Sequence, residues 1–224
     1  MPTVFITGAN RGLGLEFAKQ YKDAGWEVVA TCRQPEKATG LNALGVEVLG
    51  LDVRDMDAIA ALKSRMKGRA LDLVICNAGV YGGDQALGQS SPSEWLEVLT
   101  VNVIAPLKVV EALRGNLKAA RNPKVALMTS LMGSMDDNTS GGSYIYRSSK
   151  AGLNAVGRSL SLDLAQDGIV VVLLHPGWVR TDMGGPHGLI DPPESVAGLR
   201  RVIEGTNQDN SGRFVAYDGE ALDW

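Results

Sequence analysis

Seven short runs rich in β-branched residues constrain the fold of this chain of 224 residues more than any other feature. Several runs are apolar throughout, which is typical of strands buried on both faces of a parallel sheet. The segments between them are long enough for helices. The expected strands are Thr3–Thr7, Glu27–Thr31, Val46–Leu51, Leu71–Cys76, Lys124–Thr129, Ile169–Leu174 and Arg213–Tyr217.

The regular alternation of strand and helix predicts an α/β fold. We expect a doubly wound, mainly parallel sheet of seven strands with helices on both faces. Leu13, Phe17 and Tyr21 recur every four residues and predict a helix directly after the first strand, with Gly25 as its stop. No linker, repeat or low-complexity stretch interrupts the chain, so we expect residues 1–224 to form a single domain.

Composition excludes several classes of protein. Hydrophobic residues make up 45% and charged residues 21% of the chain, which is ordinary for a globular protein and argues against disorder or a fibre. The 22 Lys+Arg and 25 Asp+Glu give a net charge of −3, and mild acidity gives no electrostatic reason to expect a nucleic-acid partner.

Cysteine content and apolar runs bear on the location. Cys32 and Cys76 alone do not make a disulfide framework or a zinc site, and they suit a reducing compartment. The start, Met1–Thr7, lacks the pattern of a signal peptide. The longest clean apolar run, Ile169–Leu174, is far shorter than the ~18 residues of a membrane span. We therefore expect a cytoplasmic protein with no membrane partner.

A glycine-rich turn follows the first strand. Gly8, Gly12 and Gly14 allow a tight turn, close approach of a pyrophosphate and close packing of helix on strand. The helix that follows offers free N–H groups and a partial positive charge to phosphate. The turn and its position predict a dinucleotide site of the Rossmann type.

The end of the second strand indicates which dinucleotide is preferred. Arg33 stands where a site for NAD usually places Asp or Glu, and Arg11 lies inside the glycine turn. Two guanidinium groups near the ribose favour a 2′-phosphate, so we expect NADP(H), with NAD(H) as the alternative. Asp52 and Val53, after the third strand, are placed to face the adenine, although a lone Asp in a loop is often only a turn residue.

Tyr146 and Lys150 form the sharpest chemical signal. Side chains four residues apart lie on one helix face, about 6 Å from each other. A phenol has an ordinary pKa of ~10, and an ammonium at about 4 Å favours the phenolate by roughly 4 kcal/mol. The spacing therefore predicts a tyrosine whose pKa is lowered for proton transfer.

Six segments stand in a fixed order along the chain: Gly8-x-x-x-Gly12-x-Gly14, Asn77-Ala78-Gly79, Asn102, Ser130, Tyr146-x-x-x-Lys150 and Pro176-Gly177-x-x-x-Thr181. In this order they resemble the short-chain dehydrogenase/reductase family, most closely its branch of C-factor and sniffer-like carbonyl reductases.

The resemblance implies a role for each match. Tyr146 would be the general acid or base, Lys150 would lower its pKa and bind the nicotinamide ribose, and Ser130 would donate a hydrogen bond to the substrate oxygen. Asn102 would hold a water that links Lys150 to solvent. The residues expected at the cofactor are Gly8, Asn10, Arg11, Gly12, Leu13, Gly14, Arg33, Leu51, Asp52, Val53, Asn77, Ala78, Gly79, Tyr146, Lys150, Pro176, Gly177, Val179 and Thr181.

Some positions depart from the family pattern. Cys76 stands where the family commonly has a second Asn, and we interpret it as a buried small hydrophobic residue. The gap from Ser130 to Tyr146 is longer than usual, which leaves Ser134 as an alternative to Ser130. Tyr144 has no lysine four positions later and is expected to pack or to line the substrate side. Neither histidine belongs to a metal-binding pattern.

Two regions and the function itself keep alternatives open. The breaker-rich loop Gly184–Gly188 with Asp191–Pro193 predicts either a disordered linker or a flap over a site. The small residues of Ser148–Leu164 allow packing within the chain or a helix contact in a homodimer or homotetramer. The leading function is an NADP(H)-dependent reductase of a small ketone or aldehyde, acting in reverse on the alcohol. The alternative is a dinucleotide-binding signalling protein with little turnover, and a methyltransferase does not explain Tyr146 and Lys150.

Overall fold

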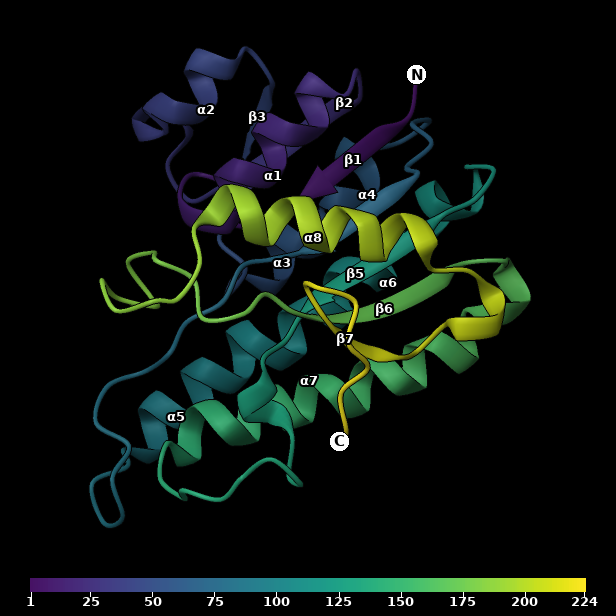
Figure 1. Ribbon diagram of the computed structural model, residues 1–224. Coiled ribbons are helices and arrows are strands. Elements are labelled where there is room, and N and C mark those ends of the chain that lie inside the picture. The colour runs from purple at the N-terminus through teal and green to yellow at the C-terminus, as the bar shows by residue number, and fades with distance from the viewer.

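All seven expected runs form strands, and they pair into one parallel sheet (Figure 1). The computed structural model describes residues 1–224. The sheet order is β3-β2-β1-β4-β5-β6-β7, so the chain changes direction across the sheet between β1 and β4. Ligands bind at such a switch point in open α/β sheets. The strands are β1 (Thr3–Ile6), β2 (Glu27–Cys32), β3 (Glu47–Gly50), β4 (Leu73–Cys76), β5 (Lys124–Met128), β6 (Val170–His175) and β7 (Phe214–Ala216).

Helices cover both faces of the sheet, which confirms the doubly wound fold. On one face lie α1 (Gly12–Asp23), α2 (Thr39–Leu44) and α8 (Pro192–Gly205). On the other lie α3 (Met56–Ala60), α4 (Leu62–Arg65), α6 (Ala105–Lys118) and α7 (Tyr144–Asp163). Figure 1 shows α8 and α7 on opposite sides of the strands, with α5 (Pro92–Leu99) beside the start of α7.

The apolar runs bury both faces of their strands. In β1, Val4 and Ile6 pack in the cluster of α1 and α8, whereas Phe5 between them packs in the cluster of α6 and α7. All three side chains, and Phe17 of α1, are fully buried. A continuous apolar run thus supplies two cores at once, and this is why the strands show no polar alternation.

The helix pair α5 and α6 is joined by a π-helical turn, Thr100–Ile104, with no break in the chain. Such turns are rare and occur often at functional sites. Asn102 lies inside it and is buried. The sequence did not predict this turn, because its residues differ in no obvious way from those of an ordinary helix.

Two further observations bear on the expectations from composition. None of the helices combines the length and the apolar character that a membrane crossing requires. Cys32 and Cys76 are both free and buried. Burial raises the pKa of the Cys76 thiol to about 12, so this residue is the inert, small apolar side chain that we expected.

Two glycines in helices make a matched test of this packing. A Cβ at Gly198 of α8 would overlap the carbonyl oxygen of Tyr217, whereas a Cβ at Gly115 of α6 would meet nothing within 4 Å. We expect Gly198→Ala to lower the free energy of unfolding by about 1–3 kcal/mol through overpacking. Gly115→Ala should raise it by about 0.5–1 kcal/mol. Urea unfolding measures both, and equal effects of the two substitutions would contradict the packing of α8 on Tyr217.

Candidate functional site

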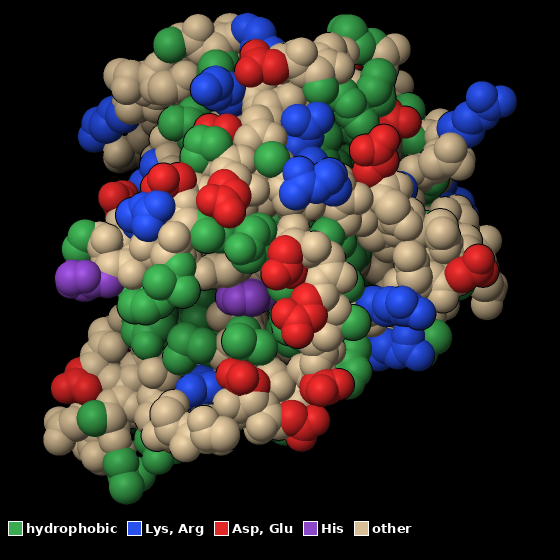
Figure 2. Space-filling view, viewed as in Figure 1, with side chains coloured by type: hydrophobic (Ala, Val, Ile, Leu, Met, Phe, Trp, Pro, Cys, Tyr) green, Lys and Arg blue, Asp and Glu red, His purple; other side chains and the backbone are tan.

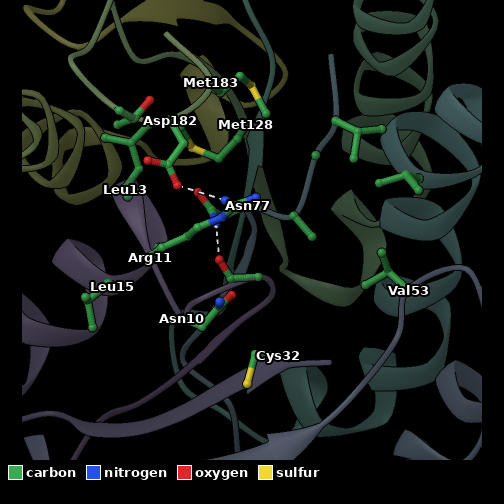
Figure 3. A pocket seen from close by; sticks show the side chains of 18 of the residues that line it. Asn10, Arg11, Leu13, Leu15, Cys32, Val53, Asn77, Met128, Asp182 and Met183 are labelled. Carbon is green, nitrogen blue, oxygen red and sulfur yellow. Dashed lines mark hydrogen bonds and ion pairs between the residues drawn. The ribbon is translucent and has the colours of Figure 1, made fainter. Parts of the chain in front are cut away.

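A cavity of about 780 Å³ opens where β1 and β4 end (Figure 3). Its volume lies within the usual range for small-molecule sites. Most of the residues expected at a cofactor line it. They are Gly8, Asn10, Arg11, Gly12, Leu13, Gly14, Arg33, Leu51, Asp52, Val53, Asn77, Ala78, Gly79, Tyr146, Lys150, Pro176 and Thr181.

The glycine turn forms one wall of the cavity and leaves no room for larger residues. Gly8 and Gly12 have φ of +64° and +53°, a conformation that favours glycine. A Cβ at Gly8 would lie 2.8 Å from the Cα of Ala78, and one at Gly14 would lie 2.6 Å from Nδ2 of Asn77. The absence of side chains here brings the backbone of β1, the start of α1 and the segment after β4 together.

Hydrogen bonds fix the two strand ends to each other. The hydroxyl of Thr7, at the end of β1, accepts from the backbone N–H groups of Asn77 and Ala78 at 3.0 and 3.1 Å. The Asn77 side chain donates to the carbonyl oxygens of Thr7 and Gly8, both at 3.0 Å. Thr7 is 2% exposed, so water does not compete for these bonds. The network holds Asn77 and the glycine turn as one unit.

Tyr146 and Lys150 lie one turn apart near the start of α7, and both are buried. Lys150 Nζ lies 5.5 Å from the centre of the Tyr146 ring and donates to the carbonyl oxygen of Met128 at 2.8 Å. Burial lowers the pKa of Lys150 to about 8. The expected pairing on one helix face is therefore present.

The expected direction of the Tyr146 pKa shift is wrong for this structure. Burial raises the pKa of Tyr146 to about 12, and the hydroxyl of Ser130 only partly offsets this effect through side-chain hydrogen bonding. The reason is that removal of the phenolate from water costs more than its polar neighbours return, since the Lys150 ammonium is directed at Met128. The phenol of Tyr146 is protonated throughout the neutral range.

Ser130, rather than Ser134, stands beside the tyrosine. Ser130 follows β5, and its hydroxyl accepts from the backbone N–H of Met132 at 3.2 Å. The same side chain hydrogen-bonds to the Tyr146 phenol, which lowers the pKa of that phenol. Ser134 is 3% exposed and accepts from the N–H of Asp137 at 3.1 Å. The longer gap before Tyr146 thus leaves the matching serine in place, and Ser134 stabilises the turn Ser134–Asp137 within that gap.

Asn102 does not line the cavity. It is 1% exposed; its Oδ1 accepts from the N–H of Val80 at 2.9 Å, and its Nδ2 donates to the Val80 carbonyl and to the Ser149 hydroxyl. Ser149 in turn donates to the Tyr146 carbonyl at 2.8 Å. Both polar atoms of the Asn102 side chain thus have protein partners. Through them the amide connects the π-helical turn to α7 and to the segment after β4.

Four arginines line the cavity, and only one has no ion-pair partner. Arg11 pairs with Asp182 at 2.8 Å (Figure 3), and Arg180 pairs with Asp191 at 2.7 Å. Arg54 pairs with two carboxylates, described below. Arg33, exposed at the end of β2, has none. The two arginines expected to act together thus differ: Arg11 is held by the loop after β6, and Arg33 is free.

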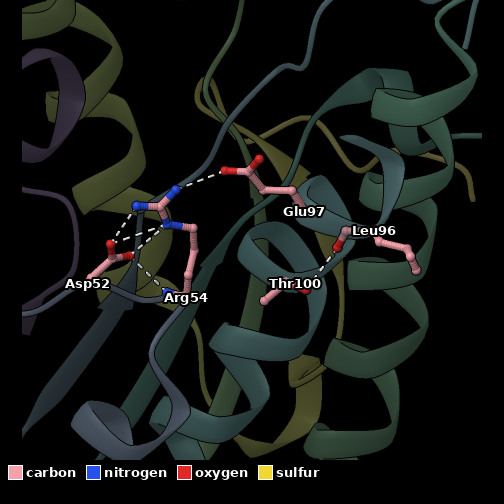
Figure 4. A network of polar contacts seen from close by, with 5 residues as sticks. All are labelled: Asp52, Arg54, Leu96, Glu97 and Thr100. Atoms are coloured by element: carbon pink, nitrogen blue, oxygen red, sulfur yellow. Dashed lines mark hydrogen bonds and ion pairs between the residues drawn. The ribbon is translucent and has the colours of Figure 1, made fainter. Parts of the chain in front are cut away.

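Two ion pairs join Asp52, Arg54 and Glu97, which all line the cavity (Figure 4). Arg54 holds both carboxylate oxygens of Asp52, at 2.7 and 3.1 Å, and reaches Glu97 of α5 at 3.0 Å. The hydrogen bonds from Arg54 lower the pKa of Asp52, and the charge of Arg33 acts in the same direction. Asp52 lines the cavity, and its carboxylate also accepts from the backbone N–H of Arg54 at 3.0 Å, as in a turn.

The loop between β6 and α8, residues 176–191, covers part of the cavity and is not a disordered linker. Pro176, Thr181 and three neighbours line the cavity. Gly177 and Val179, expected at the cofactor, do not. Gly177 has a φ of +80° and its missing side chain makes room for Ile190, whereas Val179 is 4% exposed and pairs with Ile190 in a β-bridge. Both shape the loop from behind.

Sequence reasoning missed a group of residues on the segment after β4. The Tyr81 ring lies 4.6 Å from the Tyr146 ring, and Gln85 accepts from the Tyr146 N–H. Neither position stands out in the sequence. Both lie in an irregular loop, which has no periodic pattern that would indicate a contact with residue 146. Arg54 and Glu97 were missed because they are 43 positions apart and no local pattern connects them.

Comparison with known proteins identifies the family. The model of the short chain dehydrogenases matches residues 2–188. The chain belongs to the short-chain dehydrogenase family. C-signal of Myxococcus xanthus is 47% identical over 154 residues, which are 69% of this chain and 93% of that protein.

Solved structures support the same assignment. The carbonyl reductase Sniffer of D. melanogaster matches with a TM-score of 0.95 and 34% identity, over 100% of both chains. The NADPH-bound carbonyl reductase from chicken fatty liver matches with a TM-score of 0.94 and 33% identity, over 100% of this chain and 99% of that one. The expected likeness to carbonyl reductases is confirmed, and a nicotinamide dinucleotide is the cofactor that it supports.

The burial of Lys150 predicts a pH dependence of stability. Its pKa falls from 10.5 to about 8 on folding, so between these values the unfolded chain binds the proton more tightly than the folded one. The contribution of Lys150 to the free energy of unfolding should therefore rise with pH in that window, by up to about 3 kcal/mol, whereas the contributions of Cys76 and Tyr146 fall with pH because burial raises their pKa values. Lys150→Met should remove this rise, and exposed Lys19→Met should keep it. Urea unfolding from pH 7 to 10, without cofactor, measures the difference, and parallel curves for the wild type and Lys150→Met would contradict the prediction.

Proposed function

We propose that this protein is an NADP(H)-dependent oxidoreductase that reduces a small ketone or aldehyde, or oxidises the corresponding alcohol, with Tyr146 as general acid or base. Residues 1–224 would act as one dinucleotide-binding and catalytic unit. The observation that carries the proposal is the position of buried Tyr146 and Lys150 in the same cavity as the glycine turn. A purely structural pair would not need to open onto the cavity that the glycine turn lines.

The residues present fit a dinucleotide. The glycine turn has no space for a Cβ at Gly8 or Gly14, and the N-terminus of α1 faces the cavity there. Glycine turn and helix would hold the pyrophosphate, Asp52 and Val53 the adenine, and Asn77 to Gly79 with Lys150 the nicotinamide ribose. When bound, this cofactor supplies the hydride.

The chain's own residues would donate the proton and hydrogen-bond to the substrate oxygen. The Tyr146 phenol, protonated at neutral pH because burial raises its pKa, would donate its proton to a carbonyl oxygen in the reducing direction. Ser130, beside it, would donate a second hydrogen bond to the same oxygen and stabilise its developing charge. Lys150, whose pKa is lowered to about 8, would hold the ribose hydroxyls.

The preference for the phosphorylated cofactor rests on Arg33. It is the one cavity arginine without an ion-pair partner, and its guanidinium is free to bind a 2′-phosphate in a bidentate manner. Arg11 would have to leave Asp182 to take part. NADPH is also the cofactor named for the carbonyl reductase from chicken fatty liver.

The surface near Tyr146 favours a substrate with an apolar group. Exposed hydrophobic side chains belong to the segment after β4, to the start of α7 with the loop before it, and to the loop 176–191: Tyr81, Met135, Tyr144, Trp178, Met183 and Leu189. On the face shown in Figure 2, hydrophobic side chains gather below α8, and charged side chains border them. Such a surface binds the hydrocarbon part of a carbonyl compound and leaves the polar end to Tyr146 and Ser130.

A signalling role with little turnover is the second candidate, and the 47% identity with C-signal favours it. Both Tyr146 and Lys150 are present, which favours the enzyme. We also propose a homodimer or homotetramer in a cytoplasmic, reducing location, with no nucleic-acid partner. Exposed Leu162 on α7 supports a contact between copies, and the two free, buried cysteines support the location.

The cofactor preference is tested by titration with NADPH and NADH, followed through nicotinamide fluorescence. The wild type should bind NADPH more tightly, and Arg33→Ala should reduce the preference roughly tenfold, because one charge-assisted contact is lost. Arg121→Ala, at an exposed arginine between α6 and β5, is the control and should change nothing. Equal affinity of the wild type for both dinucleotides would contradict the assignment of Arg33.

Catalysis is tested by NADPH oxidation with benzaldehyde, butanal and 2,3-butanedione as probes. Tyr146→Phe should lower kcat/KM by about 10²–10⁴-fold, because the proton donor is removed while the ring remains. Tyr21→Phe, which removes a phenol hydroxyl on α1 outside the cavity, is the matched control. Tight NADPH binding without turnover of any probe by the wild type would favour the signalling role instead.

A further inference from the structure

Helix α7 begins without a cap of its own. The residue before it, Ser143, has a φ of +49° and makes no capping hydrogen bond with its side chain. The first intrahelical bond runs from the N–H of Arg147 to the carbonyl oxygen of Ser143, at 2.9 Å. The N–H groups of Tyr144, Ile145 and Tyr146 therefore lie outside the helical ladder, and a buried one needs another partner.

Gln85 supplies that partner at the third of these residues. It comes from the loop between β4 and α5, 61 positions earlier in the chain, and is 5% exposed. Its Oε1 accepts from the N–H of Tyr146 at 2.7 Å, and its Nε2 donates to the carbonyl oxygen of Tyr81 at 2.8 Å. Both ends of the amide are satisfied, so its orientation is fixed, because a flipped amide would place like groups together.

The second bond of Gln85 also concerns Tyr146. Tyr81, whose carbonyl it holds, lays its ring against the Tyr146 ring, with 4.6 Å between ring centres and an angle of 35°. The Tyr81 hydroxyl lies 3.0 Å from the Ser143 hydroxyl at the start of α7. One glutamine side chain thus fixes the backbone of Tyr146 and the residue that covers its ring.

The loop that carries Gln85 is itself anchored. Gly82 has a φ of +91°, and a Cβ there would lie 3.3 Å from Val98 and 3.4 Å from Nε2 of Gln85. The N–H of Gly83 donates to Glu94 of α5 at 2.6 Å. The loop that carries Gln85 is therefore bound to α5 through Gly83, and Gln85 itself is bound to α7 through Tyr146.

We propose that Gln85 is a positioning residue for the reaction, which sets the place of the Tyr146 phenol through the backbone of Tyr146 and through the Tyr81 ring. The inference rests on the proposed function, because it takes Tyr146 as the proton donor. Gln85 touches neither the cavity nor the reacting atoms, since it does not line the cavity. Loss of its two hydrogen bonds should displace the Tyr146 phenol and leave the glycine turn unchanged.

The test compares three substitutions in the full-length protein. Gln85→Leu removes both hydrogen bonds at similar size, and Gln85→Glu keeps the oxygen that accepts from Tyr146. Gln89→Leu makes the same apolar change at an exposed glutamine of the same loop. Where Gln85→Leu is too unstable to assay, Gln85→Asn, which is one methylene shorter, carries the same prediction.

Kinetics give the first readout, with benzaldehyde and 2,3-butanedione as probes. Gln85→Leu should lower kcat by roughly 10–100-fold, because small misplacements of a reacting group have effects of this size. Its Kd for NADPH should stay within about twofold of the wild type, because the glycine turn is unchanged. Gln85→Glu should recover kcat to within about fivefold, since the bond to Tyr146 remains. Gln89→Leu should match the wild type in both.

Amide exchange gives a second readout that needs no turnover. In the NADPH-saturated protein, exchange at the Tyr146 N–H, followed by NMR, should quicken at least tenfold in Gln85→Leu and stay slow in Gln85→Glu. Turnover that survives Tyr146→Phe would contradict the proposed function, whatever Gln85 does. Turnover lost in Tyr146→Phe but unchanged in Gln85→Leu would overturn the positioning role alone. An equal loss of kcat and NADPH binding in Gln85→Leu would overturn it too, because the effect would then be structural.

Discussion

The hydrogen bonds between Thr7 and Asn77 hold together the part of the molecule on which the rest depends. Parallel strands end in free carbonyl and N–H groups, and at the switch point the connections on either side lead in opposite directions across the sheet. Thr7 and Asn77 use their side chains to pair these groups across the gap. The glycine turn, the start of α1 and the segment after β4 are thereby fixed as a single frame, and α7 is positioned against it.

Burial of polar groups without full compensation is the second theme of the site. Lys150 has one carbonyl partner and lies in the interior, and Tyr146 is held in its neutral form. Such groups lower the stability of a fold, and they persist at functional sites because the chemistry requires them. The seven strands and the two clusters that they bury provide the stability that offsets this loss.

The sequence predicted the parts of the structure that depend on local pattern. Each strand appeared within about two residues of its expected bounds, because buried parallel strands are long enough and apolar enough to stand out. The glycine turn, Tyr146 and Lys150 stood out in the sequence through their fixed spacing along the chain, and they line one cavity in the structure. Gln85, the bridge from Arg54 to Glu97 and the pair of Arg11 with Asp182 were missed, since each joins segments distant in sequence. The raised pKa of Tyr146 was missed because burial depends on the whole fold.

The π-helical turn at Thr100–Ile104 has a consequence for how chains of this kind can change in length. A π turn contains one residue more than the α-helix around it, so α5 and α6 are out of phase by about 100°. Trp95 before the turn donates to Ser148 of α7, and Val109 after it packs in the core. Removal of one residue together with the π turn would keep both contacts in phase, because the regular helix that remains turns through the same total angle. The π turn thus lets the chain carry one residue more between two contacts that stay in place, and buried Asn102 lies in that turn.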